Sequence, residues 1–149
     1  MTFAETGMSR REIAQILSTP MDILLVDDSR TNRLIFQCMF KMFPWTVHYA
    51  ENGQEALNAL GHRTFDLLFM DINMPVMNGI EAVQALRARE RRENCGHLPV
   101  IALTSNHQPA QIKSYLDAGM DGHVTKPFAK DAMLTEMANV LGARAATEP

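Results

Sequence analysis

Residues 65–79 of the chain read FDLLFMDINMPVMNG. A short apolar run ends at Asp71 and is followed by a segment with proline and glycine. This is the pattern of a buried strand that stops at a turn. A carboxylate at the end of such a strand is fixed in position and faces solvent, so Asp71 is a candidate nucleophile or metal ligand.

Similar short apolar runs occur on both sides of this strand, and a helical pattern separates each from the next. The predicted strands cover residues 21–26, 47–50, 66–70, 99–103 and 123–125. Apolar spacing predicts helices over about 34–43, 54–60, 80–92, 109–118 and 133–141, and a capping box at Ser9 and Glu12 predicts a short helix before residue 20. Alternating buried strands and helices predict a doubly wound α/β domain with a parallel sheet.

The chain has 149 residues, of which 46% are hydrophobic, so we expect a single globular core. We expect an N-terminal extension or linker with the short helix at 1–20, a domain at 21–142 and a flexible tail at 143–149.

Cys38 and Cys95 lack metal-ligand spacing and are expected to be reduced thiols. The charged run at 87–93 is expected to be a solvated helix end.

The charge and hydropathy of the chain exclude two classes of partner. A formal net charge of −3 gives no basic face for nucleic acid. No apolar stretch approaches the ~20 residues that span a bilayer, and the N-terminus lacks the pattern of a signal peptide. We therefore expect a cytoplasmic protein that contacts neither nucleic acid nor a membrane.

Polar residues end several of the predicted strands. Asp27 and Asp28 follow the first strand, Thr104 follows the fourth, and Lys126 follows the fifth. The carboxyl ends of parallel strands meet at one edge of a sheet, so these side chains should converge with Asp71. Clustered carboxylates favour a hard cation such as Mg²⁺, and an added ammonium and hydroxyl would stabilise a phosphoryl group. A Gly-rich phosphate loop and a dinucleotide fingerprint are both missing from the sequence, which disfavours nucleotide chemistry.

Together, four segments of the sequence resemble the receiver domain of two-component response regulators. They are Asp27-Asp28, Met70-Asp71 through Met74-Pro75 to Gly79, Ala102-Leu103-Thr104-Ser105, and Lys126-Pro127-Phe128. The resemblance covers about residues 21–142 and implies a flavodoxin-like (βα)5 fold with strand order 2-1-3-4-5. It also implies a role in bacterial two-component or phosphorelay signalling.

The resemblance implies that Asp71 accepts a phosphoryl group from a phosphohistidine. Mg²⁺, or Mn²⁺ as a substitute, would be ligated by Asp28, Asp71 and the backbone carbonyl of Asn73, while Asp27 would act largely through water. The domain would catalyse only its own phosphotransfer and autodephosphorylation, so it would not be an enzyme in the ordinary sense.

Three further positions follow from the same resemblance. Thr104 would hydrogen-bond the phosphoryl group, Lys126 would pair with it, and the Lys126-Pro127 bond is often cis in such domains. His123 occupies the position of the family's switch aromatic, which is more familiarly tyrosine or phenylalanine. We therefore expect Thr104 and His123 to form the switch.

The implied partners are a histidine kinase or a histidine phosphotransfer protein, and a downstream target that binds the face of the helix at 109–118, the strand at 123–125 and the last helix. The segments around Asp71 and Lys126 look more like receivers of hybrid sensor histidine kinases than like those of transcription factors. Both a free-standing regulator and an excised receiver stay open. In the former, the N-terminal helix would pack on the domain or form a homodimer.

Two other functions compete with phosphoacceptance. A degenerate receiver would act only as a protein interaction module, although this chain has all the matching acids and Lys126. An aspartate-nucleophile phosphatase of the haloacid dehalogenase type also uses a strand-end aspartate and Mg²⁺. Such enzymes expect a second acid two residues after the nucleophile, where this chain has Asn73.

Overall fold

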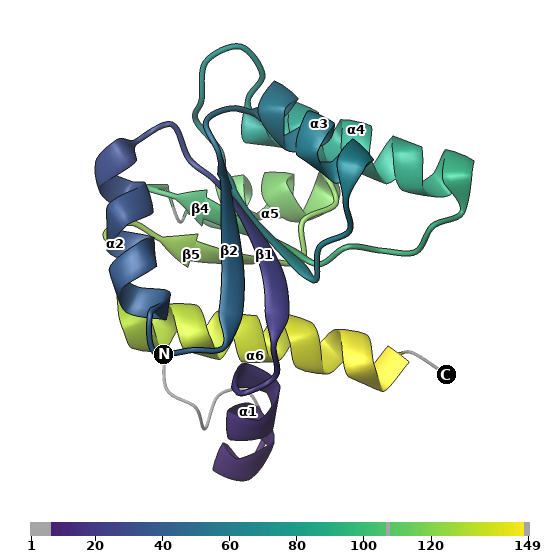
Figure 1. Ribbon diagram of the computed structural model, residues 1–149. Coiled ribbons are helices and arrows are strands. Elements are labelled where there is room, and N and C mark those ends of the chain that lie inside the picture. The colour runs from purple at the N-terminus through teal and green to yellow at the C-terminus, as the bar shows by residue number, and fades with distance from the viewer. Residues whose placement is uncertain (1–6, 107, 148–149) are drawn as a thin grey trace.

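The computed structural model describes residues 7–106 and 108–147, with side chains described through Gly142, and its centre is a five-stranded parallel sheet (Figure 1). The strand order is β2-β1-β3-β4-β5, as predicted for a flavodoxin-like domain. The strands are β1 (Met21–Val26), β2 (Trp45–Ala50), β3 (Leu67–Asp71), β4 (Val100–Thr104) and β5 (Gly122–Thr125). Every neighbouring pair is parallel, so all five carboxyl ends lie at one edge.

Helices cover both faces of the sheet. They are α1 (Arg10–Leu17), α2 (Arg30–Phe40), α3 (Gly53–His62), α4 (Gly79–Glu93), α5 (Pro109–Asp117) and α6 (Lys130–Thr147). One apolar core joins the sheet to α1, α2 and α6, and a second joins it to α3, α4 and α5. Successive residues of a strand point to opposite faces of the sheet and so pack in different cores. Ile23 lies in the first core and Leu24 in the second.

The N-terminal segment that we expected to be an extension or a linker contributes to the core. Ile13 and Leu17 of α1 are buried in the same cluster as residues of α6. The indole Nε1 of Trp45 donates to the backbone carbonyl of Leu17 at 3.0 Å, which ties the end of α1 to the start of β2. Within the described residues, α1 therefore packs as part of the domain.

Two predicted boundaries were wrong at helix ends. The tail expected from residue 143 begins as helix, because α6 continues to Thr147; residues 148–149 lie outside the described part. The helix predicted to reach residue 43 ends at Phe40, and Met42 is 86% exposed. Phe43 instead stacks on Trp45 with ring centroids 4.1 Å apart, so an aromatic contact replaces the last helical turn.

The loop after β3 packs tightly against the strand end that carries Asp71. Gly79, the first residue of α4, donates its N–H to the carbonyl of Ile72 at 3.1 Å. A Cβ atom on Gly79 would collide with the backbone carbonyl of Asp71. Glycine is therefore required at this close approach, which fixes the course of residues 72–78 beside the site.

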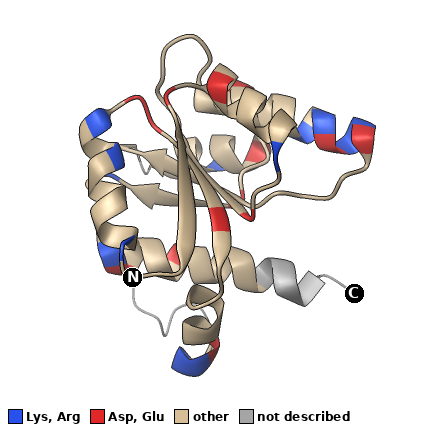
Figure 2. Cartoon of the chain, in the orientation of Figure 1, with Lys and Arg blue, Asp and Glu red and all other residues tan. Residues whose placement is uncertain are grey.

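The charged run at 87–93 is only partly a solvated helix end. Acidic and basic residues alternate along the end of α4 in Figure 2, but Arg87 is 7% exposed. Its guanidinium pairs with Glu90 at 2.7 Å and with Asp121 at 3.0 Å. These contacts join α4 to the loop before β5, at the sheet edge opposite the carboxyl ends of the strands.

None of the helices within 7–106 and 108–147 combines the length and the hydropathy that a membrane span requires.

Candidate functional site

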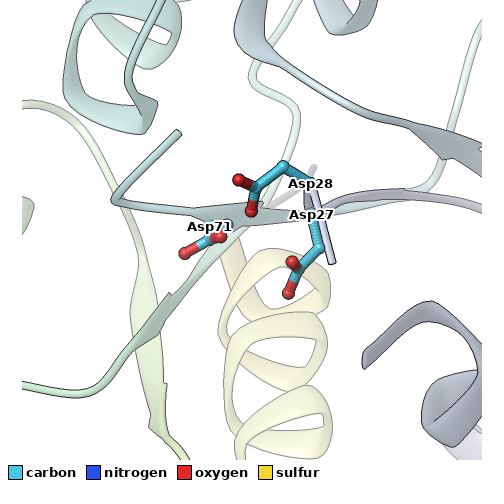
Figure 3. A group of neighbouring side chains, drawn as sticks. All are labelled: Asp27, Asp28 and Asp71. Atoms are coloured by element: carbon cyan, nitrogen blue, oxygen red, sulfur yellow. The ribbon is translucent and has the colours of Figure 1, made fainter. Parts of the chain in front are cut away.

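Three carboxylates converge at the carboxyl edge of the sheet (Figure 3). Asp27 and Asp28 follow β1, and Asp71 ends the neighbouring strand β3. One carboxylate oxygen from each residue lies within 4.8 Å of the others. Asp27 and Asp71 are buried at 0% and 2% exposure, whereas Asp28 is exposed. Such close acids repel one another unless a proton or a cation intervenes.

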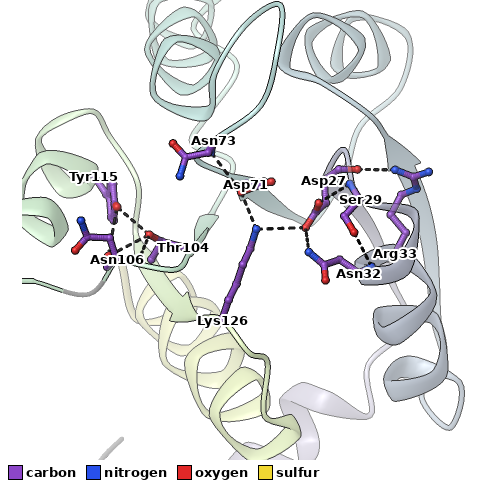
Figure 4. A network of polar contacts seen from close by, with 10 residues as sticks. All are labelled: Asp27, Ser29, Asn32, Arg33, Asp71, Asn73, Thr104, Asn106, Tyr115 and Lys126. Atoms are coloured by element: carbon purple, nitrogen blue, oxygen red, sulfur yellow. Dashed lines mark hydrogen bonds and ion pairs between the residues drawn. The ribbon is translucent and has the colours of Figure 1, made fainter.

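The carboxylate of Asp27 is held by groups at the start of α2 (Figure 4). Its Oδ1 accepts from the backbone N–H of Ser29 at 2.8 Å, and its Oδ2 accepts from the Asn32 side-chain amide at 3.1 Å. Its backbone carbonyl accepts from Arg33 Nη1 at 2.7 Å. Asp27 is therefore fixed, while the exposed carboxylate of Asp28 has no hydrogen-bond partner among the described residues.

Lys126 brings an ammonium group between the two buried acids. Its Nζ lies 3.1 Å from Asp71 Oδ1 and 3.9 Å from Asp27 Oδ2. The backbone N–H of Lys126 donates to the carbonyl of Thr104 at 2.7 Å, so β4 fixes the start of the loop, and the Lys126-Pro127 peptide is cis as expected. The cluster holds three carboxylates and one ammonium, so its net charge is negative when the acids are ionised.

The pKa of the Asp71 carboxyl is raised to about 6, first by burial and then by the negative charge of Asp27. The charge and hydrogen bond of Lys126, together with the Asn73 N–H at 3.4 Å from Oδ1, lower it. The balance leaves Asp71 poorly neutralised by the protein alone. A divalent cation would favour its ionised form, so the three-carboxylate donor set fits a hard cation such as Mg²⁺.

Thr104 lies at the same edge, but its hydroxyl is engaged away from Asp71. Oγ1 accepts from the backbone N–H of Asn106 at 2.9 Å and lies 3.0 Å from the carbonyl of that residue. It also lies 2.9 Å from the hydroxyl of Tyr115 on α5. No hydrogen bond joins Thr104 to Asp71 within the described part of the chain (Figure 4).

Sequence reasoning did not identify Tyr115 or Asn32. Tyr115 is 3% exposed and belongs to the core between α5 and the sheet. A buried tyrosine usually directs its hydroxyl to a partner, which is the signal that marks Tyr115. Asn32 lies one turn into the helix that follows two acids, where a side-chain amide can reach back to a carboxylate.

His123 lies on β5, and its side chain is half-buried. Its backbone N–H donates to Glu136 Oε2 at 3.2 Å, and the imidazole ring has no hydrogen bond among the described residues. The strand register pairs His123 with Ala102, whereas Thr104 pairs with Thr125. His123 is therefore two strand positions from Thr104, which is about 7 Å along the strand.

The model of the response regulator receiver domain family matches residues 23–138. Hybrid signal transduction histidine kinase A of Dictyostelium discoideum is 37% identical over an alignment of 115 residues that covers 74% of this chain and 5% of that protein. Sensor protein GacS of Pseudomonas syringae pv. syringae is 38% identical over 108 residues, which are 72% of this chain and 12% of that protein. The chain thus spans a small part of these relatives.

Solved structures show the same fold. The receiver domain of Saccharomyces cerevisiae Ssk1, in a co-crystal with the histidine phosphotransfer protein Ypd1, has a TM-score of 0.80 at 25% identity and covers 87% of this chain and 94% of the matched chain. The receiver domain of a Pseudomonas aeruginosa sensor histidine kinase has a TM-score of 0.73 at 27% identity, with coverages of 83% and 99%. That structure is described with a magnesium ion coordinated in its active-site cleft.

Proposed function

This chain belongs to the receiver domains of response regulators, and we propose that it takes a phosphoryl group from a partner's phosphohistidine onto the carboxylate of Asp71. The observation that supports this role is the position of the Lys126 ammonium, 3.1 Å from Asp71 Oδ1 within the three-acid cluster. A strand-end carboxylate beside an ammonium is suited to receive a group that carries negative oxygens.

The transfer exchanges one bond to phosphorus for another. An oxygen of Asp71 would bond to phosphorus while the P–N bond to the imidazole breaks and the nitrogen keeps the bonding electrons. Lys126 would pair with the oxygens of the transferred group, and Thr104 would donate a hydrogen bond to one of them. Both groups favour the product because its charge lies on oxygens that they can reach.

The donor set supports a Mg²⁺ site in this edge, with Mn²⁺ as a substitute. Asp28, Asp71 and the backbone carbonyl of Asn73 would hold the ion, and Asp27 would act through water. The bound ion would offset the negative charge of the carboxylates and of the transferred phosphoryl oxygens. Asp28 suits direct ligation because its carboxylate is exposed and not engaged by the described residues, whereas both oxygens of Asp27 already accept hydrogen bonds.

The partner class follows from the same chemistry. We propose a histidine kinase or a histidine phosphotransfer protein as donor, since relatives are histidine kinases and the Ssk1 receiver is crystallised with Ypd1. We propose that the surface of α5, β5 and α6 binds the downstream target. Thr104 lies just before α5 in the chain, and Lys126 lies between β5 and α6, so both residues connect the site to this surface.

Labelling with acetyl phosphate and Mg²⁺ tests the proposal. We expect one phosphoryl group per chain, lost in Asp71→Asn and on chelation of the metal. Asp117→Asn is the matched control, because it makes the same change at an exposed carboxylate that pairs only with Lys113 in the described contacts. A folded wild type that stayed unlabelled would identify the chain as an interaction module. Steady turnover of a small phosphomonoester would instead indicate a phosphatase.

A further inference from the structure

The hydroxyl groups of Thr104 and Tyr115 face each other in a buried pair, 2.9 Å apart. Thr104 is 1% exposed and Tyr115 is 3% exposed. The pair closes on the backbone of Asn106, whose N–H donates to Thr104 and whose carbonyl lies 3.0 Å from Thr104 Oγ1 and 3.4 Å from the Tyr115 hydroxyl. The three groups form a complete network in the state described.

The network uses the single hydrogen of the Thr104 hydroxyl. In one arrangement Thr104 donates to the Asn106 carbonyl and Tyr115 donates to Thr104. In the other, Thr104 donates to Tyr115, which donates to the carbonyl. Each hydroxyl has one hydrogen, so neither arrangement leaves a Thr104 donor for another acceptor. A phosphoryl group on Asp71 presents acceptor oxygens, so Thr104 binds it only by withdrawing its hydrogen from this network.

We propose that Tyr115 senses phosphorylation, because its hydroxyl and a phosphoryl group on Asp71 hold the Thr104 side chain in two different orientations. This inference rests on the function proposed above. When the Thr104 side chain rotates to donate to the phosphoryl group, its Oγ1 leaves the position 2.9 Å from the Tyr115 hydroxyl, which keeps only the longer contact with Asn106. A buried hydroxyl without a partner is unfavourable, so the ring must shift to restore a hydrogen bond.

We expect α5 to move when the Tyr115 ring shifts, because few contacts hold this helix against the sheet. Tyr115 is the single fully buried residue of α5, all of whose residues are described. The N-cap residue Gln108 makes no side-chain capping bond, so the helix start is weakly held. A displaced Tyr115 ring therefore moves α5 relative to the sheet. His123, whose ring has no hydrogen bond within the described residues, is not needed as the relay.

Fluorine NMR can follow Tyr115 separately, because the chain has two tyrosines and a labelled protein would give one resonance for each. In protein labelled with 3-fluorotyrosine, Mg²⁺ and beryllofluoride, which mimics the phosphoryl group on Asp71, should shift the Tyr115 resonance. The resonance of Tyr49, 39% exposed on edge strand β2, should stay in place. Thr104→Ser should keep the Tyr115 shift because it retains the hydroxyl, and Thr104→Val should abolish it.

The affinity for beryllofluoride gives a second measurement. If Tyr115 had only a structural role, its replacement would not make beryllofluoride bind more tightly. Tyr115→Phe removes the hydrogen bond that holds Thr104 in the network, so beryllofluoride should bind about three- to tenfold more tightly, the factor expected for one hydrogen bond. Tyr49→Phe, the matched loss of a phenolic hydroxyl, should leave the affinity unchanged. Unchanged or weaker binding by Tyr115→Phe, or an unmoved Tyr115 resonance in a wild type that binds beryllofluoride, would overturn this inference alone. A wild type that bound no beryllofluoride would overturn the proposed function as well.

Discussion

The ammonium of Lys126 lies 3.1 Å from Oδ1 of Asp71, although 55 residues separate the two in the chain. The contact exists because β5 and β3 flank β4, so the loops after all three strands open at one edge. Lys126 also lies 3.9 Å from Asp27, and it is thus the cation closest to two buried acids among the described residues. Lys126 should therefore be the main group that lowers the pKa of Asp71.

Replacing Lys126 by methionine should raise the pKa of Asp71 above about 6, because the nearby positive charge and its hydrogen bond both lower that pKa. The Asp71 carboxyl can be titrated by carbon NMR without divalent metal. Labelling by acetyl phosphate should also become slower. Lys113→Met, which removes an exposed lysine on α5, should change neither quantity. An Asp71 pKa that stayed the same in Lys126→Met would show that the ion pair does not form in solution.

The pKa of Asp71 predicts a loss of stability as pH rises. Its carboxyl titrates at about 6 in the folded chain, above the ordinary value of 3.8, so the folded state binds its proton more tightly than the unfolded state does. The free energy of unfolding should therefore fall as pH increases from about 4 to 6, by about 2 kcal/mol without divalent metal. Urea unfolding at a series of pH values measures this change.

Two controls assign that pH dependence to the site. Asp71→Asn should remove it and leave the chain more stable than wild type at neutral pH, because a neutral amide replaces a poorly solvated charge. Mg²⁺ should restore stability at neutral pH in the wild type and have little effect on Asp71→Asn. If both proteins lost stability equally between pH 4 and 6, another group would be responsible.

The strand-end residues were accessible from sequence, whereas Tyr115 was not. Asp71 ends an apolar run and Lys126 follows the fifth predicted strand, and parallel topology alone brings such strand ends together. The contact between Tyr115 and Thr104 depends on how α5 is rotated about its axis. The apolar pattern of this helix in the sequence is too weak to determine that rotation. The position of α1 stayed open between packing on the domain and dimerisation for a similar reason: a capping box fixes where a helix begins but not what the helix packs against.

The amide of Asn32 should support metal binding without being a ligand. Its Nδ2 donates to Asp27 Oδ2 at 3.1 Å and so orients a carboxylate of the proposed Mg²⁺ site. Asn32→Ala should weaken Mg²⁺ binding roughly tenfold, the usual effect of losing an outer hydrogen bond to a metal-site carboxylate. Titration calorimetry measures this affinity. Asn58→Ala, which removes an exposed amide on α3, should bind Mg²⁺ like the wild type; equal affinities for all three proteins would show that Asp27 needs no such support.

The docking of α1 should contribute to the stability of the whole domain. Leu17 is 6% exposed in the core shared with α6, and its carbonyl accepts from the Trp45 indole. Leu17→Ala should lower the free energy of unfolding by about 2–4 kcal/mol, the range for a truncated buried leucine. Gln15→Ala, an exposed change on the same helix, should alter it by less than about 0.5 kcal/mol. Equal urea midpoints for the two variants would mean that α1 is an appended segment, and a single cooperative transition shifted only by Leu17→Ala would mean that the domain begins with α1.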